Sequence, residues 1–218
     1  MVPGPRLLYL HGFASGPRSK KGLAVEAHLA ARGAAVERLD LRVPSLERLS
    51  FTAMLARTRA AIGGARDRAI VIGSSLGGLT AARLAEDEPR ICALVLLAPA
   101  LGFGRRWRER LGDDGWQAWM DTGWLEVHDH ATGGATRVHA DFAREVDAID
   151  VGWPDVRVPT LILHGVDDDV VPIDRSRQFA ADRRHVRLVE LPDGHDLLAT
   201  LPRILDELDR FLAPVLGA

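Results

Sequence analysis

The chain of 218 residues has the size of one domain and is long enough to bury a substantial apolar core. Hydrophobic residues make up 47% of it and charged residues 27%, a balance that excludes collagen-like, disordered and coiled-coil proteins. The 28 Lys and Arg against 30 Asp and Glu give a net charge of −2, and no basic stripe stands out, so we expect no nucleic-acid partner.

The cysteine content and the start of the chain bear on its location. Cys92 is the single cysteine and cannot form an intrachain disulfide, so nothing demands an oxidising compartment. The first residues lack a charged region followed by a long apolar one, and no apolar run approaches the ~20 residues of a membrane span. We therefore expect a cytoplasmic protein without a membrane span.

Short apolar runs alternate with segments of helical period, a pattern typical of βαβ units whose parallel sheet is buried on both faces. The predicted strands are residues 6–10, 35–39, 69–72, 91–97, 160–163 and 186–191. The predicted helices are residues 20–31, 46–62, 76–87, 175–181 and 198–212. The sequence thus predicts an α/β fold of three layers, with helices on both faces of a mostly parallel sheet of about six strands.

Residues 102–153 break this alternation. They hold all five tryptophans of the chain, together with helical patches at about 105–111, 114–120 and 136–148. A connection of this length in a compact domain is usually a lid or a binding element. We therefore expect one domain over residues 1–218, with a small helical lid inserted at 102–153.

The segment Gly73-Ser74-Ser75-Leu76-Gly77 follows a buried strand and precedes a predicted helix, which is the context of a nucleophile elbow. In such a turn a strained serine lifts its hydroxyl above the sheet, and the residues two before and two after it must lack side chains. Only Ser75 has glycine at both positions. The alternative is a tight strand-to-helix turn with no chemistry.

A serine nucleophile also needs a general base and a group that orients the base. Asp167, Asp168 and Asp169 follow a predicted strand, where side chains emerge at the carboxyl edge of the sheet, and His195 follows the last predicted strand. The chain order Ser, Asp, His is that of the α/β-hydrolases, whereas chymotrypsin-like and subtilisin-like enzymes use other orders. The sequence therefore holds candidates for a complete catalytic triad.

Together these motifs resemble the α/β-hydrolase superfamily, and its small bacterial esterases and thioesterases in particular. The matching segments, in family order, are the oxyanion-loop motif His11-Gly12-Phe13, the elbow 73–77, the acid loop 164–172 and the terminal pair Gly194-His195. They extend over nearly the whole chain, so the combination is much more specific than any one motif. The first predicted strand already leads into the oxyanion-loop motif, so we expect a sheet trimmed of the two antiparallel strands that open the full-length family fold.

The resemblance implies a serine hydrolase of carboxylic esters or thioesters that forms a covalent acyl-enzyme and needs no cofactor. Ser75 is expected to attack the acyl carbon, His195 to accept and return the proton, and Asp168 to hold the imidazole tautomer. In the family register the acid is Asp168, with Asp167 and Asp169 as the flanking alternatives.

The oxyanion that forms on the substrate needs hydrogen-bond donors aimed at it. The resemblance assigns this role to the backbone N–H groups of Phe13 and Leu76. It also implies structural hydrogen bonding, rather than catalysis, for His11 and His164, which lie beside glycines at strand ends.

Within residues 102–153, several side chains have both a functional and a structural interpretation. Residues of types that bind zinc are His128, Asp129, His130, His139 and Asp141, but no closed set of ligands follows, so we expect a polar loop and no metal. Arginines that could attract an anionic substrate, but more often form a solvated helix face, are Arg105, Arg106, Arg108 and Arg110. Tryptophans that line an acyl pocket or form the small core of the lid are Trp107, Trp116, Trp119 and Trp124.

The expected partner is thus a small-molecule acyl ester or thioester, and the sequence indicates no oligomeric state. The same triad serves carbon–carbon bond hydrolases, perhydrolases and peptidases. A hypothesis of another class is a non-catalytic binding module that keeps the elbow as scaffold, against which the intact set of Ser75, Asp168 and His195 argues.

Overall fold

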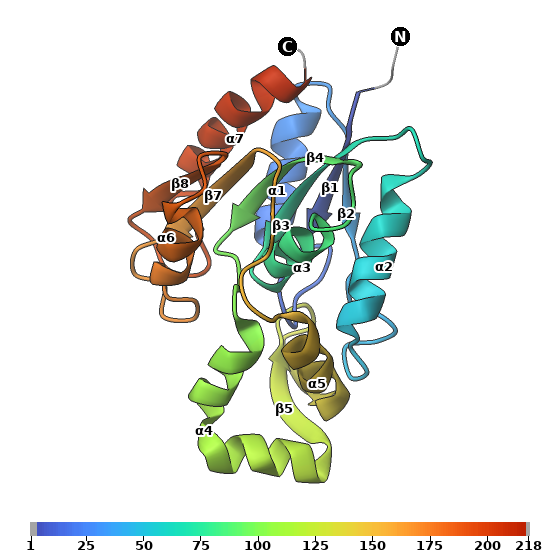
Figure 1. Cartoon of the computed structure of the whole chain (residues 1–218), viewed down its shortest axis with the longest axis vertical. Helices are drawn as coiled ribbons and strands as arrows, with labels where there is room; N and C mark the ends of the chain where they lie inside the picture. The colour runs from blue at the N-terminus through green and yellow to red at the C-terminus, as the bar shows by residue number, and fades with distance from the viewer. Residues whose placement is uncertain (1–3, 217–218) are drawn as a thin grey trace.

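Six parallel strands form the central sheet of the computed structural model, which describes residues 4–216 (Figure 1). The strands are β1 (Arg6–Leu10), β2 (Val36–Leu39), β3 (Ala69–Ser74), β4 (Ile91–Leu97), β7 (Thr160–Gly165) and β8 (Val186–Leu191). Their order is β2-β1-β3-β4-β7-β8, and each neighbouring pair in these residues runs parallel. The predicted sheet, trimmed to its parallel strands, is confirmed.

Helices cover both faces of the sheet, as predicted. They are α1 (Lys20–Ala30), α2 (Phe51–Ile62), α3 (Leu76–Leu84), α6 (Asp174–Ala181) and α7 (Leu201–Leu216). Side chains alternate between the faces along each strand. Leu7 and Tyr9 of β1 pack with α1 and α7, whereas Leu8 and Leu10 pack with α2, α3 and α6. The result is a three-layer sandwich with an apolar core on each side of the sheet.

The start of α2 differs from the sequence-based expectation. The helix begins at Phe51, not at residue 46. Ser50 has extended backbone angles, and its Oγ accepts a hydrogen bond from Ala53 N at 3.1 Å, which satisfies one free donor of the first turn. The apolar residues at helical spacing before Ser50 therefore belong to a packed loop and not to a helix.

The inserted segment, residues 102–153, lies between β4 and β7 and extends below the sheet in Figure 1. It contains α4 (Phe103–Thr122), the strands β5 (Trp124–Asp129) and β6 (Gly134–His139), and α5 (Ala140–Ile149). The two expected helical patches at 105–111 and 114–120 are the halves of α4. They meet at a kink where Gly112 has φ 69° and ψ 171°.

The helical patch predicted at about 136–148 is wrong at its start. Residues 136–139, assigned from the sequence to a helix, belong to β6, which pairs with β5 as an antiparallel hairpin. The turn between the strands contains Gly133 at φ 76°, a left-handed conformation that glycine adopts without steric cost. Only residues from Ala140 onward continue as the helix α5.

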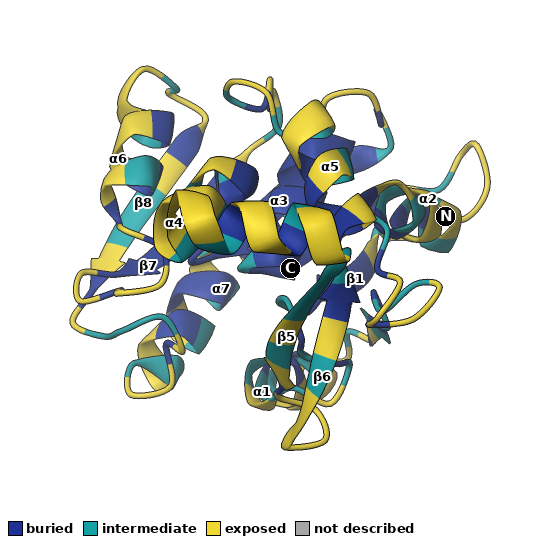
Figure 2. Ribbon diagram, turned by 90° about the horizontal axis from the view of Figure 1, so that it is seen from below, coloured by how far each residue is buried: buried dark blue, intermediate teal, exposed yellow. Residues whose placement is uncertain are grey.

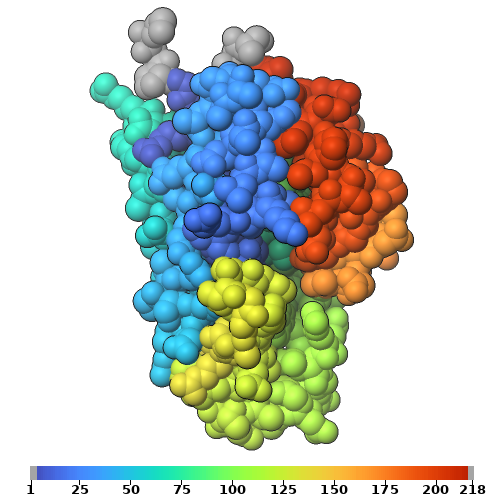
Figure 3. All heavy atoms as spheres, turned by 180° about the vertical axis from the view of Figure 1, so that it is seen from behind, coloured from blue at the N-terminus to red at the C-terminus, as the bar shows by residue number. Residues whose placement is uncertain are grey.

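The inserted segment packs against the rest of the chain through an aromatic cluster and through its hairpin. The ring of Phe13, in the loop after β1, lies 5.9 Å from Phe103 and 5.8 Å from Phe142. In Figure 3 the hairpin lies directly below the N-terminal part of the chain, where His130 N donates to Ala14 O at 2.8 Å. Figure 2 shows α4 exposed on its outer side and α3 buried beneath.

None of the helices within residues 4–216 combines the length and the apolar character needed to cross a membrane.

Candidate active site

The elbow predicted at residues 73–77 joins β3 to α3. Ser75 stands at the junction with φ 53° and ψ −115°, outside the conformations that a side chain-bearing residue favours. A Cβ at Gly73 would collide with the backbone of Gly77, and a Cβ at Gly77 would collide with the carbonyl of Leu10. The two glycines are therefore required by the close approach of three backbone segments, and the turn lifts Ser75 to the carboxyl edge of the sheet.

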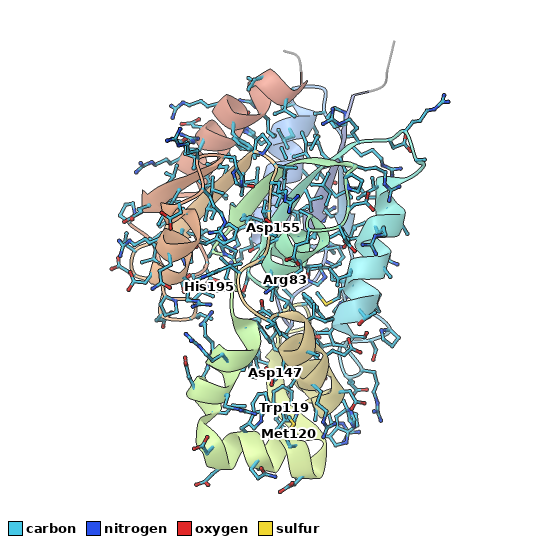
Figure 4. The ribbon with its side chains drawn as sticks, viewed as in Figure 1. Arg83, Trp119, Met120, Asp147, Asp155 and His195 are labelled. Atoms are coloured by element: carbon cyan, nitrogen blue, oxygen red, sulfur yellow. The ribbon has the colours of Figure 1, made fainter. Side chains whose placement is uncertain are left out.

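The structure brings Ser75, His195 and Asp168 together at this edge. Ser75 Oγ lies 3.1 Å from His195 Nε2, and His195 Nδ1 lies 2.8 Å from Asp168 Oδ2. Because a carboxylate only accepts, Nδ1 donates to Asp168, which leaves Nε2 as the acceptor for the serine hydroxyl. His195, labelled in Figure 4, lies on the side of the sheet that faces α4. The arrangement can transfer a proton from Ser75 to the imidazole.

Asp168 is buried and fully hydrogen-bonded. Its Oδ1 accepts from the backbone N–H of Val170 at 2.9 Å and of Val171 at 2.6 Å, and its Oδ2 accepts from His164 and His195. Burial acts to raise the pKa of Asp168, but the hydrogen bonds from His164, His195 and Val171 outweigh it and hold that pKa well below its ordinary range. The carboxylate is thus kept ionised where it accepts the hydrogen bond from the imidazole.

The loops that carry the acid and the histidine lie against each other. A Cβ at Gly165 would collide with the carbonyl of Asp193, and Asp167 N donates to the same carbonyl at 3.1 Å. This close contact fixes the acid loop beside the residue that precedes Gly194 and His195. Asp167 and Asp169 are both exposed, so among the three candidates the geometry places only Asp168 on the imidazole.

His164 supports Asp168 from below. Its Nδ1 accepts from Ser176 Oγ at 2.7 Å, and its Nε2 lies 3.1 Å from Asp168 Oδ2 and 2.8 Å from Val171 O. The side chain is fully buried. It therefore holds the acid loop and has no access to substrate, as the structural interpretation predicts.

His11 has an equally structural environment. Its Nε2 accepts from Leu41 N at 2.9 Å, and its Nδ1 donates to Gly12 O at 2.9 Å. Burial lowers the pKa of His11, which keeps the ring neutral and suits one donor and one acceptor. The ring fixes the loop that presents Gly12 and Phe13 to the elbow.

The backbone N–H groups of Phe13 and Leu76 have no acceptor within residues 4–216. Leu76 is the first residue of α3, where N–H groups lack an intrahelical partner and the helix dipole favours negative charge. Gly12 lies beside the elbow, since a Cβ there would come within 3.3 Å of Ser75 Cβ. Two free donors thus belong to the segments on either side of the Ser75 hydroxyl.

The sequence matches the model of a family described as "Uncharacterised protein family (UPF0227)" over residues 6–212. The chain belongs to this family. The match extends from the first strand to the last helix, so it includes every segment that builds the site. No curated protein has a sequence that matches the chain.

Solved structures of α/β-hydrolases share the fold. Alpha/beta hydrolase domain-containing protein 10 from mouse is similar over 99% of this chain and 92% of its own, with 21% identity and a TM-score of 0.81. Est1E from Butyrivibrio proteoclasticus with ferulic acid bound is similar over 100% of this chain and 92% of its own, with 21% identity and a TM-score of 0.79. Monoacylglycerol lipase from Paleococcus ferrophilus is similar over 95% of this chain and 96% of its own, with 18% identity and a TM-score of 0.71. These similarities confirm the α/β-hydrolase fold that the sequence predicts.

The four tryptophans suggested for substrate binding occupy different places. Trp107 is half-buried, and its ring lies 5.1 Å from the ring of Phe13. Trp116 and Trp119 are buried inside the inserted segment, and Trp119 Nε1 donates to a backbone carbonyl of β6. Trp119 is labelled in Figure 4. Trp124 is on the hairpin, and its ring centre lies 4.8 Å from that of His139. In this conformation only Trp107 contacts a residue of the site.

The zinc-type residues of the inserted segment do not converge. Among residues 4–216, no three His, Cys, Asp or Glu side chains form a group that could hold a metal ion. Asp129 instead accepts from Ala131 N and Thr132 Oγ1, which closes the hairpin turn. The rings of His128 and His130 lie 5.0 Å apart on the surface of that hairpin.

Lys21 is a neighbour of the site that the sequence analysis missed. It is half-buried in the first turn of α1, and its Nζ donates to the backbone carbonyl of His195 at 3.4 Å. Burial lowers the pKa of Lys21 to about 8, partly offset by the carboxylates of Asp196, Asp168 and Asp193. The contact joins residues far apart in the chain, so no local pattern announces it.

Proposed function

We propose that this chain is a serine hydrolase that cleaves carboxylic esters or thioesters through an acyl-enzyme. The observation that carries the proposal is the continuous chain of hydrogen bonds from Ser75 through His195 to Asp168, built on a serine at positive φ beside two free backbone donors. Structures of the same fold that are named as an esterase domain and as a monoacylglycerol lipase support the reaction class. The proposed reaction needs no cofactor.

The acylation step follows from the geometry. Ser75 Oγ forms a bond to the acyl carbon while its proton passes to His195 Nε2. The N–H groups of Phe13 and Leu76 receive the negative charge that develops on the acyl oxygen. The bond from the acyl carbon to the leaving oxygen or sulfur then breaks, and His195 returns its proton to the leaving group.

Deacylation repeats the sequence with water. His195 accepts a proton from water as the water oxygen bonds to the acyl carbon, and the bond to Ser75 Oγ breaks as that oxygen regains a proton. Asp168 stays ionised throughout and stabilises the imidazolium that forms in each half of the reaction.

The inserted segment is proposed to act as a lid over this site within a single domain. It follows β4 at the carboxyl edge of the sheet, where the loops that carry catalytic groups also lie. Its aromatic cluster is continuous with the core under the sheet and reaches Phe13 of the proposed oxyanion hole through Trp107. The lid thereby contributes a wall for the acyl group.

Ser75→Ala tests the proposal on a panel of 4-nitrophenyl esters and acyl thioesters of graded chain length. Loss of a triad nucleophile commonly lowers kcat by about 10⁴-fold or more, and we expect that result here with the fold intact by circular dichroism. Ser74→Ala is the matched control and should retain most of the activity. Full activity in the Ser75 variant would overturn the proposal, and the relative rates on esters and thioesters identify the bond that is cleaved.

A further inference from the structure

Arg106 is a half-buried arginine without a partner. Its side chain makes no hydrogen bond, ion pair or ring contact with any of residues 4–216. Every other arginine of residues 4–216 that is not exposed makes at least one such contact. Arg42 pairs with Asp40 and Arg83 with Asp150, for example, while Arg183 lies over the ring of Phe179.

A second arginine lies in the same place with most of its donors unused. Arg175 donates from Nε to Leu101 O at 3.3 Å, and its guanidinium lies 4.2 Å from the centre of the Trp153 ring. Its terminal nitrogens abut Gly102, one turn before Arg106 on α4. None of the carboxylates in residues 4–216 pairs with it.

Charge makes this pair costly without a third group. Burial lowers the pKa of Arg106; the carboxylates of Asp168 and Glu109 oppose that effect only in part, and the positive charge of Arg175 adds to it. Burial and the charge of Arg105 also lower the pKa of Arg175, against the opposite effect of the carboxylates of Asp150 and Glu109. An anion held between two partly desolvated like charges would stabilise both of them.

The pair faces the proposed active site. Phe103 and Trp107, which precede and follow Arg106 on α4, both pack on Phe13, at 5.9 and 5.1 Å between ring centres. The carboxylate of Asp168 lies close enough to Arg106 to act on its charge. Figure 4 shows His195 at the edge of the sheet that faces the start of α4. An anion held by Arg106 would therefore lie within the reach of one substrate molecule from Ser75.

Neutralising Asp168 is not a sufficient reason for Arg106. The two oxygens of Asp168 already accept four hydrogen bonds, from Val170, Val171, His164 and His195, so its acceptor sites are filled. The five N–H donors of Arg106 remain free. A planar guanidinium of this kind binds carboxylate or phosphate oxygens in pairs.

We propose that Arg106, supported by Arg175, binds an anionic group of the substrate, so that the favoured esters carry a carboxylate or a phosphate besides the bond that is cleaved. This inference rests on the proposed ester hydrolysis at Ser75. The anionic group belongs either to the acyl part or to the leaving group, and both place the same chemistry beside α4.

Two pairs of substrates test the inference with Arg106→Gln. The acyl pair is mono-4-nitrophenyl succinate and its neutral methyl ester, and the leaving-group pair is 4-acetoxybenzoate and its methyl ester. Because a hydrogen bond to a charged group is lost, kcat/KM for the anionic member of one pair should fall by about 10- to 100-fold, while the neutral members change by less than about threefold. The pair that responds identifies which part of the substrate carries the anion.

Arg108→Gln is the matched control, since it removes the same charge from an exposed side chain of the same helix, over the ring of Trp116. It should leave all four rates nearly unchanged. Equal losses on anionic and neutral members, or no loss in either pair, would overturn the role of Arg106. Hydrolysis that persists in Ser75→Ala would instead overturn the reaction on which the inference rests.

Discussion

The sheet edge that carries the proposed triad and the inserted segment beside it are built differently. Every residue of β3, β4, β7 and α3 is buried, and the elbow between β3 and α3 has no room for an added methyl group. In the inserted segment, α4 is broken at Gly112 and buries few of its residues, and the hairpin that follows is mostly half-buried or exposed. The atoms proposed to react are thus fixed by dense packing, and the side chains proposed to select the substrate are on the more exposed part.

Asp168→Asn should have the largest effect on the fixed part. An amide holds the imidazole in the wrong tautomer, so we expect kcat to fall by about 10⁴-fold with KM little changed. Asp169→Asn makes the same chemical change at the next residue, whose side chain is exposed, and should leave kcat nearly unchanged. Equal effects of the two substitutions on ester hydrolysis would show that the acid is misassigned.

The same variant gives a pH test of stability. Since the pKa of Asp168 is lowered in the folded protein, its contribution to stability is present above the ordinary carboxyl pKa of about 3.9 and is lost as the pH falls through the folded value. The gap in unfolding free energy between the wild type and Asp168→Asn should therefore narrow as denaturant titrations move from pH 6 to pH 3. A constant gap would contradict the lowered pKa.

In the inserted segment, Trp119→Ala and Trp107→Ala should behave differently. Trp119 is buried and hydrogen-bonded, so its truncation should cost about 3–5 kcal/mol of stability and lower all activities in parallel. Trp107 borders Phe13, so its truncation should change the preference for acyl length more than the melting temperature. Unchanged length profiles of kcat/KM in both variants would leave the segment without a role in the pocket.

Gly77→Ala and Gly134→Ala compare the packing of the two regions. At Gly77 the added methyl meets the carbonyl of Leu10, which we expect to destabilise the protein by about 3 kcal/mol or more. At Gly134, in the hairpin, the nearest atom is Thr132 Oγ1 at 3.7 Å, and the same change should be tolerated. The denaturant midpoints of the two variants measure their losses of stability, and similar losses would contradict the difference in packing between the two regions.

Lys21→Met should have the smallest effect. Loss of the hydrogen bond to the His195 carbonyl should lower kcat/KM by about 3- to 10-fold at pH 7. Because the pKa of Lys21 is about 8, the wild type loses the Lys21 charge on going to pH 9. The values of kcat/KM for the wild type and for Lys21→Met should therefore approach each other at pH 9. Lys20→Met, an exposed neighbour, is the control. A ratio that stays constant with pH would exclude a role for the Lys21 charge.

The parts of the molecule that follow from local pattern could be predicted from the sequence, and the rest could not. Buried strands are continuous apolar runs, and glycine on both sides of Ser75 is demanded by local backbone contact, so both are visible in the sequence. The hairpin was missed because residues 136–139 lead into α5 with a compatible helical period, although Gly133-Gly134 was a turn signal. Lys21 reaches the site only through the packing of α1 against the histidine loop.

The central claim is that Ser75 is a nucleophile activated by His195. Reaction with a fluorophosphonate tests it most directly, because the serine oxygen displaces fluoride and remains covalently bound to phosphorus. We predict that mass spectrometry finds a single phosphonyl group, on the peptide that contains Ser75, and that His195→Gln slows its formation strongly. A label on another residue, or labelling of Ser75 that does not depend on His195, would contradict the account.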